Sequence, residues 1–151
     1  MKKLILTSIL GGILVLAIGM LIAQVVQALF PALQTEYQNV HLFRTQSDPA
    51  MLVYFVHPFF FSMAFAWVWK KTRALSDTGS NWRKAIRFAF ACWIVSTVPG
   101  MMISYASFPI SLLMTATWAV SALAEFTCLG LLFSKLMNET STHTLPDKSV
   151  A

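Results

Sequence analysis

The sequence predicts an all-α integral membrane protein, a bundle of four transmembrane helices with both termini in the cytoplasm. Charged residues make up only 11% of the 151 residues, whereas a soluble domain carries about 25%. Three long stretches, 4–35, 49–69 and 88–124, hold no charged residue. A spanning helix needs about 20 apolar residues. The last stretch stays apolar beyond Glu125 as far as Phe133, so it is long enough to cross twice.

The first predicted span covers residues 4–28 and follows the charged start Met1-Lys2-Lys3. A cleaved signal peptide has a shorter apolar core of about 7–15 residues, followed by a small-x-small cleavage site. Here Ala28-Leu29-Phe30 places a bulky residue where a small one is needed. We therefore favour a retained span.

The other predicted spans cover residues 50–69, 86–104 and 110–133. Ser80 and Asn81 are suited to cap the third helix, and Pro109 is suited to the first turn of the fourth. Residues 77–80 form a turn cluster. The single membrane domain is expected to end at residue 137. The polar segment 138–151 is expected to be a disordered tail.

The distribution of basic residues predicts the orientation. Ten of the eleven Lys and Arg residues fall on one side of the predicted spans, and Arg44 alone falls on the other. Basic residues are enriched in cytoplasmic loops. The termini and the loop 70–85 are therefore expected inside, in a bacterial-type inner membrane. This placement also explains the net charge of +5 without a nucleic-acid partner.

Glu125 is the leading candidate for a functional residue because it lies inside the fourth predicted span. An ionised carboxylate within a bilayer costs on the order of 3 kcal/mol or more. Helical spacing places Trp118, Ser121 and Cys128 on the same face. The acid could serve as a proton or cation relay or orient a ligand. The alternative, which the sequence favours, is an interhelical hydrogen bond that fixes packing.

His57 is a second candidate within a span, and Pro58 after it is expected to kink the second helix. Such a kink could open a pocket near Tyr54 and Tyr105. A histidine buried against a backbone carbonyl is the favoured alternative. The depth difference from Glu125, roughly 12 Å, argues against direct pairing of the two side chains.

A stripe of small residues on the first span, Ser8, Gly12, Gly19 and Ala23, is expected to pack against another helix, because small side chains let helices approach closely. No cofactor or metal is predicted: His41 and His143 lie outside the spans, so haem lacks a second ligand. Cys92 and Cys128 lie within spans and form no CxxC motif.

The chain resembles the small four-helix bacterial inner-membrane proteins that are grouped as domains of unknown function. The resemblance lies in the MKKLILTSILGG start, the polar outer loop, the basic inner loop and SYASFPISLL before the last span. It implies a topology and no activity.

These features favour a noncatalytic membrane protein that works as a homo-oligomer or as the accessory subunit of another membrane protein, with the lipid bilayer as its surroundings. The alternative is a small proton-coupled transporter or binder of a lipophilic or cationic molecule that uses Glu125. An enzyme ranks third, because no nucleophile–base pair or phosphate loop is visible.

Overall fold

The computed structural model describes residues 2–72 and 80–137. The secondary structure in this part of the chain is all helical, with no strand. The predicted turn at 77–79 and the predicted disordered tail from Asn138 lie outside the described residues.

Four long helices form the bundle, and each is long and apolar enough to cross a membrane. Helix α1 (Lys2–Leu29) is followed by the short α2 (Pro31–Tyr37), the 3-10 turn η1 (Pro49–Met51) and α3 (Leu52–Thr72). Helices α4 (Asn81–Ser107) and α5 (Leu112–Leu136) complete the chain. The four helices and their apolar character are the pattern of a multi-pass membrane protein.

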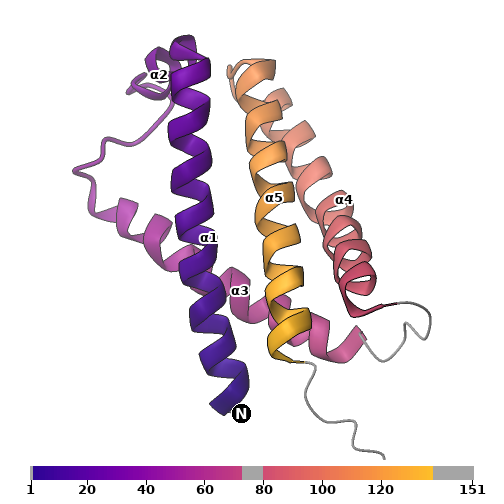
Figure 1. The fold of residues 1–151 in the computed structure, drawn as a ribbon. Coiled ribbons are helices and arrows are strands. Elements are labelled where there is room, and N and C mark those ends of the chain that lie inside the picture. The colour runs from indigo at the N-terminus through magenta and orange to yellow at the C-terminus, as the bar shows by residue number, and fades with distance from the viewer. Residues whose placement is uncertain (1, 73–79, 138–151) are drawn as a thin grey trace, which may run out of the picture.

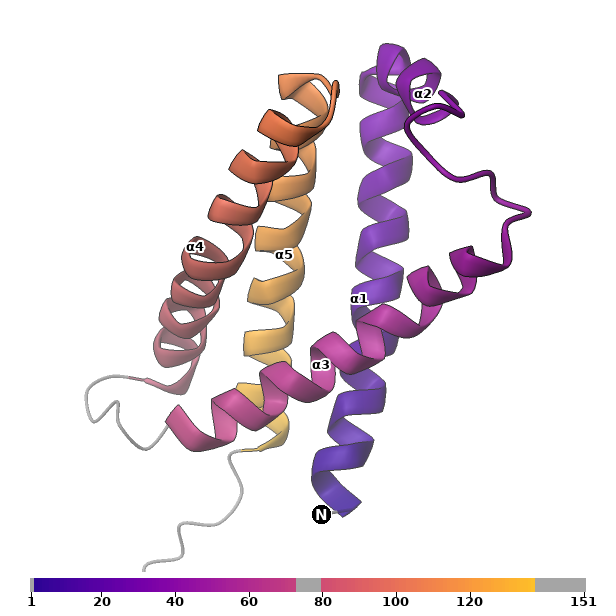
Figure 2. The same ribbon diagram turned by 180° about the vertical axis from the view of Figure 1, so that it is seen from behind.

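The bundle combines a helical hairpin, α4 and α5, with an oblique crossing of α1 and α3 (Figures 1 and 2). Helices α4 and α5 run antiparallel and side by side, and α1 stands next to α5. Helix α3 crosses α1 obliquely and ends beneath α4 and α5, near the end of the bundle where the N-terminus lies. We call this the N-terminal end, and the opposite end, where α2 lies, the α2 end.

Several helix boundaries differ from the predicted spans. Helix α4 begins at Asn81, as the predicted cap at Ser80 and Asn81 implies, and so extends beyond the predicted span 86–104 and carries Arg83 and Lys84. Ser80 is its N-cap residue, but the side chain makes no capping hydrogen bond.

The prediction that Pro109 begins the last helix is wrong. Helix α5 starts at Leu112, and the Ser111 hydroxyl accepts a hydrogen bond from the Met114 N–H at 3.1 Å. A serine cap that satisfies a free N–H of the first turn outweighs the preference of proline for that turn.

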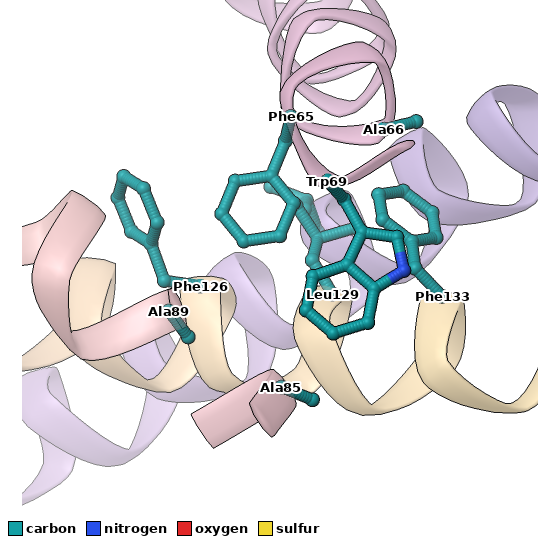
Figure 3. Close-up of a cluster of buried hydrophobic side chains, with 9 residues drawn as sticks. Phe65, Ala66, Trp69, Ala85, Ala89, Phe126, Leu129 and Phe133 are labelled. Carbon is teal, nitrogen blue, oxygen red and sulfur yellow. The ribbon is translucent and has the colours of Figure 1, made fainter. Parts of the chain in front are cut away.

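The N-terminal end of the bundle is densely packed with aromatic rings (Figure 3). Phe65 and Trp69 of α3 meet Phe126, Leu129 and Phe133 of α5, and the small side chains of α4 close the cluster. The ring centroids of Phe65 and Phe126 are 5.5 Å apart. Such edge-to-face contacts add to the packing of apolar surface.

Two adjacent glycines bring α1 and α3 into contact. A Cβ added at Gly12 would lie 2.5 Å from Phe59 Cδ1 of α3. One added at Gly11 would collide with Ser62 Oγ of α3 and lie 2.9 Å from Leu129 Cδ2 of α5. Both distances are shorter than van der Waals contact. The helices can therefore cross this closely only because these two residues have no side chain.

The oblique path of α3 leaves the α2 end of the bundle without a fourth helix. The first turns of α3 lie beside the middle of α1, and the irregular segment 38–48 connects them to α2 (Figures 1 and 2). Here the space between α1 and α5 is bordered by loop and turn residues instead of a packed helix. This difference between the two ends positions the candidate site.

Candidate functional site: a cavity with an acid at one end

A cavity of about 770 Å³ lies between α1 and α5 at the α2 end of the bundle. Helix α1 contributes Gly19, Ala23, Val26 and Gln27, and α5 contributes Thr117, Trp118, Ser121, Ala122 and Glu125. The remaining border comes from the connecting segments and the start of α3: Tyr37, Leu42, Phe43, Arg44, Gln46, Met51 and Tyr54.

Glu125 lies near the middle of α5. It is eleven residues from Leu136 and thirteen from Leu112, which corresponds to about 16 and 20 Å along the helix. The carboxylate faces α1 at Gly19, where an added Cβ would lie 3.1 Å from Oε1. The side chain is half-buried, so the acid forms the deep end of the cavity.

Two of the side chains predicted to share a face with Glu125 direct their protons elsewhere. The Ser121 hydroxyl donates to the Thr117 carbonyl at 2.8 Å, and the Trp118 indole N–H donates to the Tyr37 hydroxyl. Within the described residues the Glu125 carboxylate has no hydrogen bond. The packing role predicted for Glu125 needs a hydrogen-bond partner, and this part of the chain supplies none.

Small side chains on α1 make the space beside Glu125. Gly19 and Ala23 belong to the predicted small-residue stripe, but they border the cavity instead of a packed helix. Ser8 is buried at the N-terminal end and donates to the Leu4 carbonyl at 2.8 Å. The stripe is thus divided between the α1–α3 contact, where Gly12 lies, and the cavity.

An aromatic group borders the cavity at the α2 end. Tyr37, Phe43 and Trp118 pack with centroids 5.6 to 6.3 Å apart. Burial raises the pKa of the Tyr37 hydroxyl above its ordinary value, so this group stays uncharged at neutral pH. The Tyr37–Trp118 hydrogen bond connects α2 to α5 and holds both rings in place.

A second contact fixes α2 over the start of α5. The Ser111 backbone N–H donates to Glu36 Oε1 at 2.6 Å. Leu33 of α2 is buried with Ile110 and Met114 directly below. Helix α2 is therefore attached to α5 by these contacts and to α1 through the chain.

One ion pair lies at the edge of the cavity. Arg44 Nη1 is 2.8 Å from Asp48 Oδ2, and the arginine side chain is largely exposed. The Ala50 N–H and the Arg44 guanidinium hold the pKa of Asp48 below its ordinary value. The charge of Arg44 is thereby balanced by a neighbour four residues along the chain.

Two predicted site residues lie away from the cavity. His57 is exposed and stacks on Phe61 with centroids 6.0 Å apart, so the expectation that it is buried is wrong. Tyr105 is 49% exposed on α4. Trp118, Ser121 and Tyr54 do border the cavity with Glu125, whereas Cys128 does not.

The sequence reasoning missed the contribution of α2 and of the segment 38–48. The sequence indicates only a polar loop here, although Pro31, shortly after the first predicted span, is typical of a first helical turn. Within the described residues no group of three or more His, Cys, Asp or Glu side chains is placed to hold a metal ion.

No family model, curated protein or solved structure matches this chain. The resemblance to small four-helix inner-membrane proteins therefore stays a prediction. The proposals below rest on the cavity and its residues.

Proposed function

We propose that this chain is a small membrane protein that binds a lipophilic organic cation in the cavity, with proton-coupled transport as the use of that binding. One observation carries the proposal: the Glu125 carboxylate lies at the deep end of a cavity of about 770 Å³ and has no hydrogen bond within the described residues. Pockets for small molecules commonly measure about 300–1,000 Å³.

The chemistry of the cavity favours a cation over an anion or a neutral molecule. A carboxylate within a membrane is costly without a partner, and a bound cation supplies one. Trp118, Tyr37 and Tyr54 supply ring surfaces for the lipophilic part of such a cation. The same acid can take up a proton when the cation leaves, which gives a physical basis for exchange of the two.

The orientation belongs to the same proposal: the α2 end faces outward and the N-terminal end faces the cytoplasm of a bacterial-type inner membrane. The excess of Lys and Arg at the N-terminal end supports it. In a chain with Cys92 and Cys128 replaced by alanine, Ser47→Cys should react with an impermeant maleimide added outside intact cells. Lys71→Cys should react only after lysis; the reverse pattern would overturn the orientation.

The binding proposal predicts a strong dependence on Glu125. Purified protein in lipid nanodiscs should bind decylammonium saturably, and it should bind decanol, which has the same chain without charge, at least about tenfold more weakly, as loss of a charge-assisted hydrogen bond implies. Glu125→Gln should remove this difference. The measurement is isothermal titration calorimetry.

Glu36→Gln is the matched control, because it also replaces an acid but lies outside the cavity lining and keeps an oxygen for the Ser111 N–H. It should bind like the unmodified chain. Equal binding of decylammonium by the Glu125→Gln and unmodified chains would contradict the proposed function.

The oligomeric or accessory role that the sequence favoured stays a prediction. Helix α4 exposes large apolar side chains such as Val95, Met102 and Ile103, and lipid alone accounts for such a surface. The cavity is lined by residues of one chain, so it supports a binding role that needs no second chain.

A further inference from the structure

The cavity changes in character along its length. Glu125, Ser121 and Trp118 lie at intervals of one turn or nearly so on α5 and all border it, so about 10 Å of helix separates the acid from the indole. On the antiparallel α1, Gly19 faces the acid and Ala23 follows one turn closer to the α2 end. The acid and the aromatic group are thus separated by a section lined with small side chains.

The end near Glu125 offers acceptors of hydrogen bonds and no free donor. The hydroxyl proton of Ser121 goes to the backbone carbonyl of Thr117 at 2.8 Å. The Ser121 oxygen and the Glu125 carboxylate can still accept. A ligand with N–H groups fits this end, since N–H donors form charge-assisted bonds with a carboxylate.

The opposite end favours an uncharged, flat group. The indole N–H of Trp118 is already bonded to Tyr37, so the aromatic group presents ring surfaces. Glu125 is the only acid among the described residues that border the cavity, and Arg44 at this end is already paired with Asp48. A second positive charge on the ligand would therefore find no carboxylate there. An aromatic ring gains edge-to-face contacts there.

We propose that the ligand is an amphiphilic monocation: a protonated amine that bonds Glu125, joined by an apolar chain to an uncharged aromatic group about 10 Å away. This inference rests on the proposed function and specifies its substrate class. Quaternary ammonium ions, dications and neutral lipids fit the cavity less well.

The test is a series of ω-phenylalkylamines measured by calorimetry in nanodiscs, with ring-to-nitrogen distances from about 5 to about 15 Å, on either side of two helical turns. Affinity should peak near the middle of the series. The N-trimethyl form of the best amine should bind about tenfold more weakly, because it cannot donate a hydrogen bond.

One variant and its control test the part played by the acceptor beside the acid. Ser121→Ala should reduce the preference for the primary over the quaternary form, because it removes one of the two acceptors near the charged group and leaves Glu125 in place. Thr127→Val is the matched control, since this hydroxyl also donates to its own helix, at Leu123, but does not border the cavity. The control should keep the preference.

The outcomes separate this inference from the proposed function. If amines bind in a Glu125-dependent manner but affinity ignores chain length and N-methylation, the ligand class is wrong and the cation site stands. If no amine in the series depends on Glu125, both proposals fail. A peak in affinity together with a reduced preference in Ser121→Ala supports both.

Discussion

Replacing Gly19 with leucine is expected to abolish amine binding while the bundle stays folded. A Cβ at this position would lie 3.1 Å from Glu125 Oε1, and the remaining atoms of a leucine would enter the cavity beside the acid. When a side chain fills ligand space with more than one methylene group, ligand binding weakens by several kcal/mol. We expect Kd for the preferred amine to rise about 100-fold or more.

Gly100→Leu is the control for this variant. An added Cβ at Gly100 meets nothing within 4 Å, and both substitutions raise helix propensity by a similar amount. Calorimetry with the same amine should show full binding by Gly100→Leu. If Gly19→Leu binds as tightly as the control, the ligand does not occupy the cavity beside Glu125.

Replacing Phe133 with alanine is expected to give the largest loss of stability. Phe133 of α5 is completely buried where α5 meets α3, and its ring centroid lies 5.9 Å from that of Phe65. In a micelle or bilayer the unfolded helix also keeps its side chains in an apolar medium, so most of the transfer term disappears. The cavity left behind still costs about 2 kcal/mol.

Reversible unfolding in mixed micelles with increasing dodecyl sulfate measures this loss, with helical circular dichroism as the signal. Phe60→Ala serves as the comparison because Phe60 is 64% exposed. Its unfolding midpoint should shift by much less. Similar shifts for both variants would mean that the aromatic cluster of Figure 3 does not stabilise the bundle.

The sequence was sufficient to predict the four long helices, because runs without charge and of spanning length leave little choice of structure. Glu125 was found for the same reason: one acid among apolar residues is conspicuous. Its relation to Trp118 and Ser121 followed from helical spacing. These are local properties of the chain, and the structure places all three residues at the cavity.

The cavity itself could not be predicted, because it depends on the oblique path of α3. Nothing in the composition of the second span indicates where its helix crosses α1. The crossing depends on Gly11 and Gly12 meeting Phe59, Ser62 and Leu129 from two other helices. The contributions of Tyr37, Phe43 and Arg44 depend in turn on where that crossing leaves the segment 38–48. The exposure of His57 also depends on the path of α3, so the sequence could not predict it.

The unequal packing of the two ends bears on how a membrane potential would act on this protein. In the proposed orientation, the hollow half gives water access from outside, and the aromatic cluster forms the insulating layer on the cytoplasmic side. Most of the voltage would then fall across that layer, between Glu125 and the N-terminal end. A cation would reach Glu125 from outside with little electrical work. Nearly all of the electrical work would be done when the cation moves from Glu125 to the cytoplasmic side. This work is about 2.3 kcal/mol per elementary charge for each 100 mV.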